Sequence, residues 1–228
     1  MSETDFFRPR PPTRAWLWIG LAIVAVSIWQ LSDPVRAAAL DYAFGVVPAH
    51  YQAGAGVFHS PTDFLLPLVG HAFLHGSWLH LGVNMLVYFQ LSSLVERRLS
   101  LGGAAGDWRF ALLFLVSAIG GAVGFVLIAP NTDVPAIGAS GAICGIFAAY
   151  LLGARPRWQD ALKDRRIQQA ALIFLAVNVA LMAFLTEAGV LPIAWEAHLG
   201  GFVAGGVAFV LLAPRPRLLE GPWGRFLG

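Results

Sequence analysis

The sequence predicts an all-α polytopic membrane protein: a bundle of six transmembrane helices with both termini in the cytoplasm. Three observations support this fold class, namely the composition, the spacing of the charges and the placement of the basic residues. The 228 residues are 57% hydrophobic and only 12% charged, with a mean hydropathy of +0.68. Soluble globular domains carry about twice that charged fraction. We therefore expect an integral membrane protein.

Six windows without Asp, Glu, Lys or Arg divide the chain, and each is close to the roughly 17–25 residues that cross a bilayer as a helix. These windows are residues 15–32, 64–95, 110–132, 134–154, 167–186 and 197–214. A further window, residues 42–62, contains Pro48, three glycines and two histidines without a sustained apolar run, so we interpret it as a loop. We expect one domain over residues 15–214, with residues 32–63 forming a membrane-associated first loop.

The basic residues predict the orientation of the spans. Fourteen of the fifteen lysines and arginines lie before span one, after span six, or between spans two and three and spans four and five. Only Arg36 lies on the opposite side. Basic residues gather on the cytoplasmic side of a membrane, so residues 1–14 and 215–228 are expected to be cytoplasmic tails. The basic residues are explained by the membrane orientation. They therefore do not indicate a nucleic-acid partner.

Polar side chains inside the spans are candidate functional residues because lipid solvates them poorly. Span two carries four of them, which we predict to lie along one helix: His71, His75, His80 and Asn84. His80 and Asn84, four residues apart, share one face of that helix. Span four adds Ser140 and span six adds His198. Counted from the cytoplasmic ends at about 1.5 Å per residue, His80, Ser140 and His198 lie roughly 23–26 Å up their helices, at nearly one level.

This set of side chains predicts hydrolytic chemistry. A serine hydroxyl becomes a good nucleophile when an adjacent base accepts its proton, and His198 has no carboxylate within its own span to engage it. No Asp or Glu lies at this depth in any span, so a Ser–His dyad is the economical interpretation. Asn84, His80 and the Ser140 backbone N–H could stabilise an oxyanion. Gly138 and Gly141 let the backbone bend and approach closely.

Several of these residues also have a structural interpretation. A single serine in a span most often serves helix packing or bonds a backbone carbonyl, and the nearby histidine is what favours catalysis here. We expect structural roles for His71 and His75 near the membrane interface. Gly201 and Gly205 indicate close packing of span six on span four or another neighbour. Cys144, the only cysteine, excludes an internal disulfide and is interpreted as a small buried apolar residue.

Taken in order, the motifs resemble those of the rhomboid intramembrane serine proteases, over about residues 15–214. The family's G-x-S-G is similar to residues 138–141, and its H-x-x-x-N on the second span is similar to residues 80–84. Its A-H-x-G-G-x-x-x-G on the last span is similar to residues 197–205. The spaced histidines match His71 and His75, and the Glu-x-Arg that closes span two matches residues 96–98.

The resemblance implies Ser140 as nucleophile and His198 as general base, with His80, Asn84 and the Ser140 backbone N–H at the oxyanion. The residues that then shape or support the site are Gly138, Gly141, His71, His75, Glu96, Gly201 and Gly205. It also implies a serine endopeptidase without metal or cofactor, in a bacterial inner (plasma) membrane, whose site opens to the non-cytoplasmic side. The implied substrates are single-pass transmembrane proteins, cut near the outer end of the helix after a small residue.

Two positions depart from the family pattern. Cys144 stands where some bacterial members place a tyrosine that stacks on the catalytic histidine, and Leu66–Pro67 align near a Trp-Arg pair often found in the first loop. In addition, we predict that the fourth loop, residues 184–195, is mobile and caps the site, because Gly189 and Pro192 interrupt the helix there.

Three other functions are alternatives. A catalytically silent rhomboid-like protein would bind membrane clients without cutting them, and such proteins usually lack the serine or the histidine. A small transporter or channel predicts intramembrane carboxylates or paired broken helices, and the sequence shows neither. A metal site built from His75, His80 and His198 would combine two side chains from different faces of a straight helix, and no carboxylate completes the set.

Overall fold

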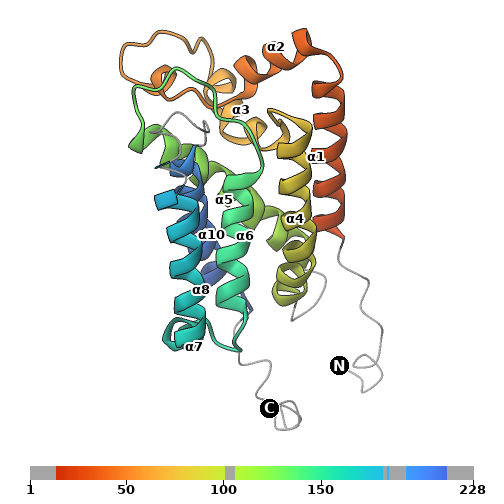
Figure 1. The fold of residues 1–228 in the computed structure, drawn as a ribbon, viewed down its shortest axis with the longest axis vertical. Coiled ribbons are helices and arrows are strands. Elements are labelled where there is room, and N and C mark those ends of the chain that lie inside the picture. The colour runs from red at the N-terminus through yellow and green to blue at the C-terminus, as the bar shows by residue number, and fades with distance from the viewer. Residues whose placement is uncertain (1–13, 101–105, 182–183, 185–193, 215–228) are drawn as a thin grey trace.

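The computed structural model describes residues 14–100, 106–181, 184 and 194–214, and its long helices stand side by side in one bundle (Figure 1). The bundle helices are α1 (Ala15–Leu31), α4 (Trp78–Leu99), α5 (Gly106–Ile128), α6 (Ser140–Gly153), α8 (Arg165–Leu175) and α10 (Trp195–Leu212). The shorter elements are α2 (Pro34–Phe44), η2 (Pro48–Tyr51), α3 (Pro61–Gly70), η3 (His71–Phe73), α7 (Trp158–Lys163) and the π-helical η4 (Ala176–Leu181). In Figure 1, α2 and α3 lie at the upper end of the bundle and α7 at the lower end. The predicted all-α class is confirmed for the described residues, whose only strand-like pairing is an isolated bridge.

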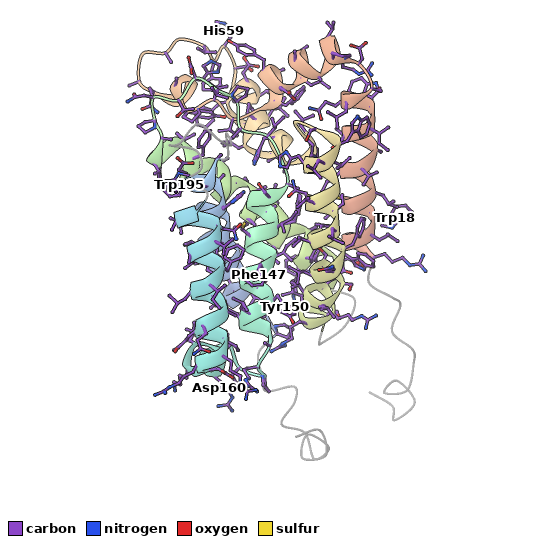
Figure 2. The ribbon with its side chains drawn as sticks, in the orientation of Figure 1. Trp18, His59, Phe147, Tyr150, Asp160 and Trp195 are labelled. Carbon is purple, nitrogen blue, oxygen red and sulfur yellow. The ribbon has the colours of Figure 1, made fainter. Side chains whose placement is uncertain are left out.

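Within the described residues, three helices are long and apolar enough to cross a membrane: α4, α5 and α10. Helices α1 and α6 are also apolar but shorter, with 17 and 14 residues. Large apolar side chains project from the bundle, among them Trp18 (Figure 2) and Leu211, which are 61% and 78% exposed. Such a surface is expected where lipid is the solvent. The helices fit an integral membrane protein, and the count of six spans stays a prediction because the window 167–186 is described only in part.

Side-chain caps start several of the helices. Asp33 accepts hydrogen bonds from the N–H groups of residues 35 and 36 at the start of α2, with Pro34 in the first turn. Ser60 and Asp63 form a reciprocal capping box on α3. Ser77 caps α4 by accepting from the N–H of His80. Each such cap contributes about 1 kcal/mol of helix stability.

The prediction that the second window is one continuous helix was wrong. Helix α3 ends at Gly70, η3 follows, and the chain is extended at Leu74 before α4 begins at Trp78. The break has two local causes. The Ser77 hydroxyl starts a new helix, and the backbone N–H of His75 donates to the Gln30 side chain on α1, 2.9 Å away, instead of to a helical carbonyl.

The connection between α1 and α3 is more ordered than the loop that the sequence predicts, because it contains α2 and η2. It packs on the bundle, as expected for a loop so rich in apolar residues. Val46 and Ala136 exchange two backbone hydrogen bonds of 3.0 and 2.9 Å, and Val46 is buried in a cluster with Leu68 and Phe125. This pairing ties the connection to the segment that leads into α6. Its association with the membrane stays a prediction.

The most extensive helix contacts are those of α10 with α5 and α6, and on the α6 side glycines let the two backbones touch. A Cβ atom added to Gly201 would lie 2.0 Å from the carbonyl oxygen of Gly141. One added to Gly205 would lie 2.2 Å from the Cα atom of Gly145. No real Cβ tolerates such distances, so both positions require glycine.

Gly200, the residue before Gly201, packs α10 on α5 in the same way. A Cβ atom on Gly200 would lie 2.3 Å from the carbonyl oxygen of Gly120 and 2.9 Å from the Cα atom of Gly124. Helix α10 is therefore held between two glycine-lined neighbours, and its axial position and rotation relative to α6 are tightly constrained.

Helix α8 lies at the edge of the bundle, and in the described structure none of its residues is buried. Its Phe174 ring lies between Phe147 of α6 and Phe202 of α10, with ring centroids 4.6 and 5.2 Å apart. These aromatic contacts attach α8 to the tightly packed centre.

We predict that Gly205→Ala lowers the thermal unfolding midpoint in detergent, because the added methyl group must push α10 away from the backbone of α6. Overpacking of this kind costs about 1–3 kcal/mol. The matched control is Gly82→Ala on α4, where no described atom lies within 4 Å of the added Cβ and the midpoint should stay level or rise slightly. Equal midpoints for the two variants would contradict the proposed role of the glycine contact.

Candidate functional site

Ser140 and His198 meet at the upper end of the bundle. Ser140 is the first residue of α6, and His198 lies in the first turn of α10, which begins at Trp195 (Figure 2). The Nε2 atom of His198 lies 2.8 Å from the Oγ atom of Ser140, and both residues are half-buried. In this arrangement a neutral imidazole can accept the hydroxyl proton, which is the requirement for an activated serine.

The other ring nitrogen of His198 has no hydrogen bond that meets ordinary geometry among the described residues. Within the described residues no carboxylate is therefore bonded to this ring nitrogen, and the dyad stays a prediction.

The turn before α6 presents Ser140. Gly138 has a φ of +128°, a backbone conformation that side chains with a Cβ rarely adopt, and its N–H donates to the carbonyl oxygen of His71, 2.9 Å away. In the described structure no side chain caps α6. The first N–H groups of a helix have no acceptor within the helix, and the helix dipole favours an anion there. The start of α6 is therefore suited to stabilise negative charge beside Ser140.

His80 and Asn84 face this turn from the first two turns of α4. A Cβ on Gly138 would lie 2.8 Å from Cε1 and 3.0 Å from Nε2 of His80, and 3.6 Å from Nδ2 of Asn84. The Asn84 amide nitrogen is buried and has no hydrogen-bond partner among the described residues. A buried amide left without a partner costs free energy, so this donor is available to a group that enters the site.

His71 and His75 are buried inside the protein. The sequence predicted structural roles for both, but at the membrane interface. Nδ1 of His71 lies 2.8 Å from the carbonyl oxygen of Pro67, and Nδ1 of His75 lies 2.9 Å from the hydroxyl of Ser27. The His75 ring also meets the His80 ring edge to face, with centroids 5.0 Å apart. The His75 ring therefore supports His80 from behind, and His71 holds the turn before Ser140 through its backbone carbonyl.

Ser27 and Gln30 of α1 hold His75 through its ring and its backbone, and neither is among the residues predicted from the sequence. Gln30 in turn donates to the Asp41 carboxylate of α2 at 2.5 Å. A signal was present, since Ser27 and Gln30 are polar residues three apart in an apolar window and so share one helix face.

The remaining predicted residues lie outside the contact between serine and histidine. Glu96 is at the lower end of α4, where its carboxylate accepts the N–H of Trp16 at 3.3 Å. Gly141, Gly201 and Gly205 form the close packing of α6 and α10 described above. Cys144 is buried one turn below Ser140.

Two further predictions concern a mobile cap over the site and an alternative metal site. The proposed cap, residues 184–195, falls mostly on residues 185–193, which lie outside the described residues. The alternative metal site needs at least three ligands, and the part of the chain that the structure describes contains no group of three His, Cys, Asp or Glu residues arranged to hold a metal ion.

Comparisons with known proteins agree on a family. A family model described as the Rhomboid domain matches residues 63–215. The chain is 32% identical over 145 residues to Rhomboid-type serine protease 2 of Emericella nidulans, a match covering 62% of this chain and 25% of that protein. It is 29% identical over 150 residues to Inactive RHOMBOID-like protein 8 of Arabidopsis thaliana, covering 65% and 40%. With the rhomboid protein YdcA of Bacillus subtilis it shares 28% identity over 190 residues, covering 83% and 78%.

These relatives differ in extent and in activity. The chain spans less than half of the Emericella and Arabidopsis proteins that it matches, and most of YdcA. The names of the relatives include both a serine protease and an inactive protein. The comparisons thus leave activity to be argued from the site.

We predict that Gly138→Ala slows covalent labelling of Ser140 by a fluorophosphonate. The new methyl group would meet the His80 ring and distort the turn, and a displacement of about 1 Å in such a site can cost up to about 100-fold in rate. The matched control is Gly54→Ala, since Gly54 also has a positive φ of +86° but no described atom within 4 Å of its Cβ position. Equal labelling of both variants would show that the contact with His80 is unimportant.

Proposed function

Because this chain belongs to the rhomboid family, we propose that it is an intramembrane serine endopeptidase, cutting peptide bonds in or near the transmembrane helices of membrane proteins. The observation that carries the proposal is the 2.8 Å contact between His198 Nε2 and Ser140 Oγ. The proposed domain is residues 15–214, which includes all but the last residue of the region matched by the family model, residues 63–215.

In the proposed mechanism, Ser140 Oγ attacks the scissile carbonyl carbon while His198 Nε2 accepts the hydroxyl proton. The tetrahedral oxyanion is stabilised by the Ser140 backbone N–H, His80 and Asn84. His198 then returns the proton to the leaving amine, and the peptide remains esterified to Ser140. Water, deprotonated by the same histidine, releases the acyl group and regenerates the serine.

The proposed orientation follows from the two ends of the bundle. The dyad lies at the upper end, whereas the basic residues in the last turn of α4 and those that follow α6 lie at the end where α7 is found (Figure 1). Basic residues favour the cytoplasmic side, so we place α7 there and the site toward the non-cytoplasmic face, with bacterial inner membrane as the proposed location. The proposed substrates are single-pass transmembrane proteins.

The alternative function is that of a catalytically silent protein that binds membrane clients. The similarity to Inactive RHOMBOID-like protein 8 is the observation in favour of this alternative. Against it stands the presence of both reacting side chains in hydrogen-bond contact. The two functions differ in one measurable property, because only the protease forms a covalent bond with its substrate.

We predict that Ser140→Ala and His198→Ala each lower cleavage of a single-pass model substrate in proteoliposomes by at least about 1,000-fold, because each removes one partner of the dyad. Matched controls are Ser93→Ala, in the lower half of α4, and His59→Ala, an exposed residue of the first connection (Figure 2). Both controls should cleave at the parental rate. A folded parent protein that binds the substrate without cleaving it would favour the silent alternative.

We predict that Asn84→Ala lowers kcat by about 100- to 1,000-fold and leaves KM nearly unchanged, because the lost donor acts on charge that develops only in the transition state. Asn131→Ala, in the exposed segment after α5, is the control. A rise in KM without loss of kcat would instead place Asn84 in substrate binding.

A further inference from the structure

At the end of the bundle opposite Ser140, an open groove lies between the C-terminal ends of α4 and α6. Its volume is about 460 Å³, within the range of ligand-binding pockets. The groove is amphipathic along its length. Leu94, Ala149 and Tyr150 line the part nearer the bundle centre, and Arg97, Arg98 and Ala154 line the part nearer the helix ends.

The two arginines make the outer part of the groove positive. Arg97 is exposed, and its side chain makes no hydrogen bond or ion pair with the described residues. Arg98 donates through Nε to the Gly153 carbonyl at 3.3 Å and through one Nη to the carbonyls of Arg155 and Pro156 at 3.3 and 2.7 Å. These carbonyls lie at the end of α6 and would otherwise repel an anion. Arg98 neutralises them and keeps the donors of its second Nη, which no described residue accepts.

Three carboxylates near this end bond other groups, and the exposed Asp160 of α7 lies outside the groove lining. Glu96 accepts the backbone N–H of Trp16 on α1, and Asp107 accepts those of Arg14 and Ala15. Asp164 forms an ion pair with Arg155. The groove lining itself contains two cations and no acid, so its charge is not balanced by the side chains that form it.

The inner part of the groove is apolar and open to the surroundings of the bundle. Leu94 is 46% exposed and Tyr150 is 38% exposed, and Figure 2 shows Tyr150 on the lower half of α6. No hydrogen bond of the Tyr150 hydroxyl is found within the described part of the chain. In an integral membrane protein, exposed apolar side chains near the end of a span face the lipid acyl chains. Arginines one turn closer to the helix end then lie at the level of the lipid headgroups.

We propose that this groove binds one anionic phospholipid, with the phosphate at Arg97 and Arg98 and an acyl chain along the exposed Leu94 and Tyr150. A free phosphate would use only the arginines, whereas a zwitterionic lipid would bring its own cation to a groove that already has two. Ser140 starts the 14-residue helix that ends at this groove, about 20 Å away along the helix axis. The lipid site is therefore separate from the dyad and does not depend on the proposed protease activity.

The test is a lipid titration of the full chain purified in detergent, followed by native mass spectrometry. The probes are phosphatidylglycerol and phosphatidylcholine with identical acyl chains. We expect one phosphatidylglycerol retained per chain at concentrations where phosphatidylcholine is not retained. Inorganic phosphate at the same concentration should not displace it. Equal retention of the two lipids, or displacement by inorganic phosphate, would overturn the proposal.

Variants locate the site. Arg97→Gln should weaken phosphatidylglycerol binding about fivefold, the effect of one basic residue near an anionic headgroup. Ala154→Glu, at an exposed position of the rim, should weaken it at least as much without touching either arginine. The matched control is Arg166→Gln, which removes one exposed charge from α8 outside the groove and should leave binding unchanged. If Arg166→Gln weakens binding as much as Arg97→Gln, the attraction is general and the groove is not a site.

Discussion

The contact on which the site depends is the glycine packing of α10 between α5 and α6. Ser140 and His198 lie 58 residues apart, on two different helices. Their 2.8 Å contact requires that the axial position and the rotation of one helix relative to the other are fixed. Backbones that touch at Gly201 and Gly141 provide that constraint directly. Longer side chains between the helices would leave rotamer freedom, and with it variation in the distance between serine and histidine.

A second constraint acts on the turn that carries Ser140, which is held from several sides. Val46 pairs with Ala136, and the His71 carbonyl accepts the N–H of Gly138. The first connection and η3 thus fix a turn whose glycine conformation would be costly if unsupported. Behind it, Ser27 and Gln30 hold His75, whose ring packs on His80. Polar side chains that are expensive to bury are here bonded to one another, which holds the site in one arrangement.

The two ends of the bundle differ in the polar groups that they leave without a partner. The upper end combines a helix start without a side-chain cap in the described structure, half-buried histidines and an unpaired amide, all suited to a transient negative charge. At the lower end, Arg98 donates to carbonyls at and just beyond the end of α6, and carboxylates accept N–H groups at the start of α1. The proposed chemistry and the proposed lipid site therefore lie on opposite faces of one membrane domain.

The sequence by itself determined the helical membrane class and named Ser140, His198, His80 and Asn84 as candidates, because apolar windows, charge placement and short motifs are local properties. It could also place Ser140 and His198 at a common depth, since the helical rise is constant. Only the tertiary structure decided that α3, η3 and α4 replace one long helix, because Gln30 takes a backbone N–H that a continuous helix would have used. It likewise decided that His71 and His75 are buried supports and that Gly138 lies against His80. These outcomes depend on contacts between residues far apart in the chain, which no periodicity within one segment can encode.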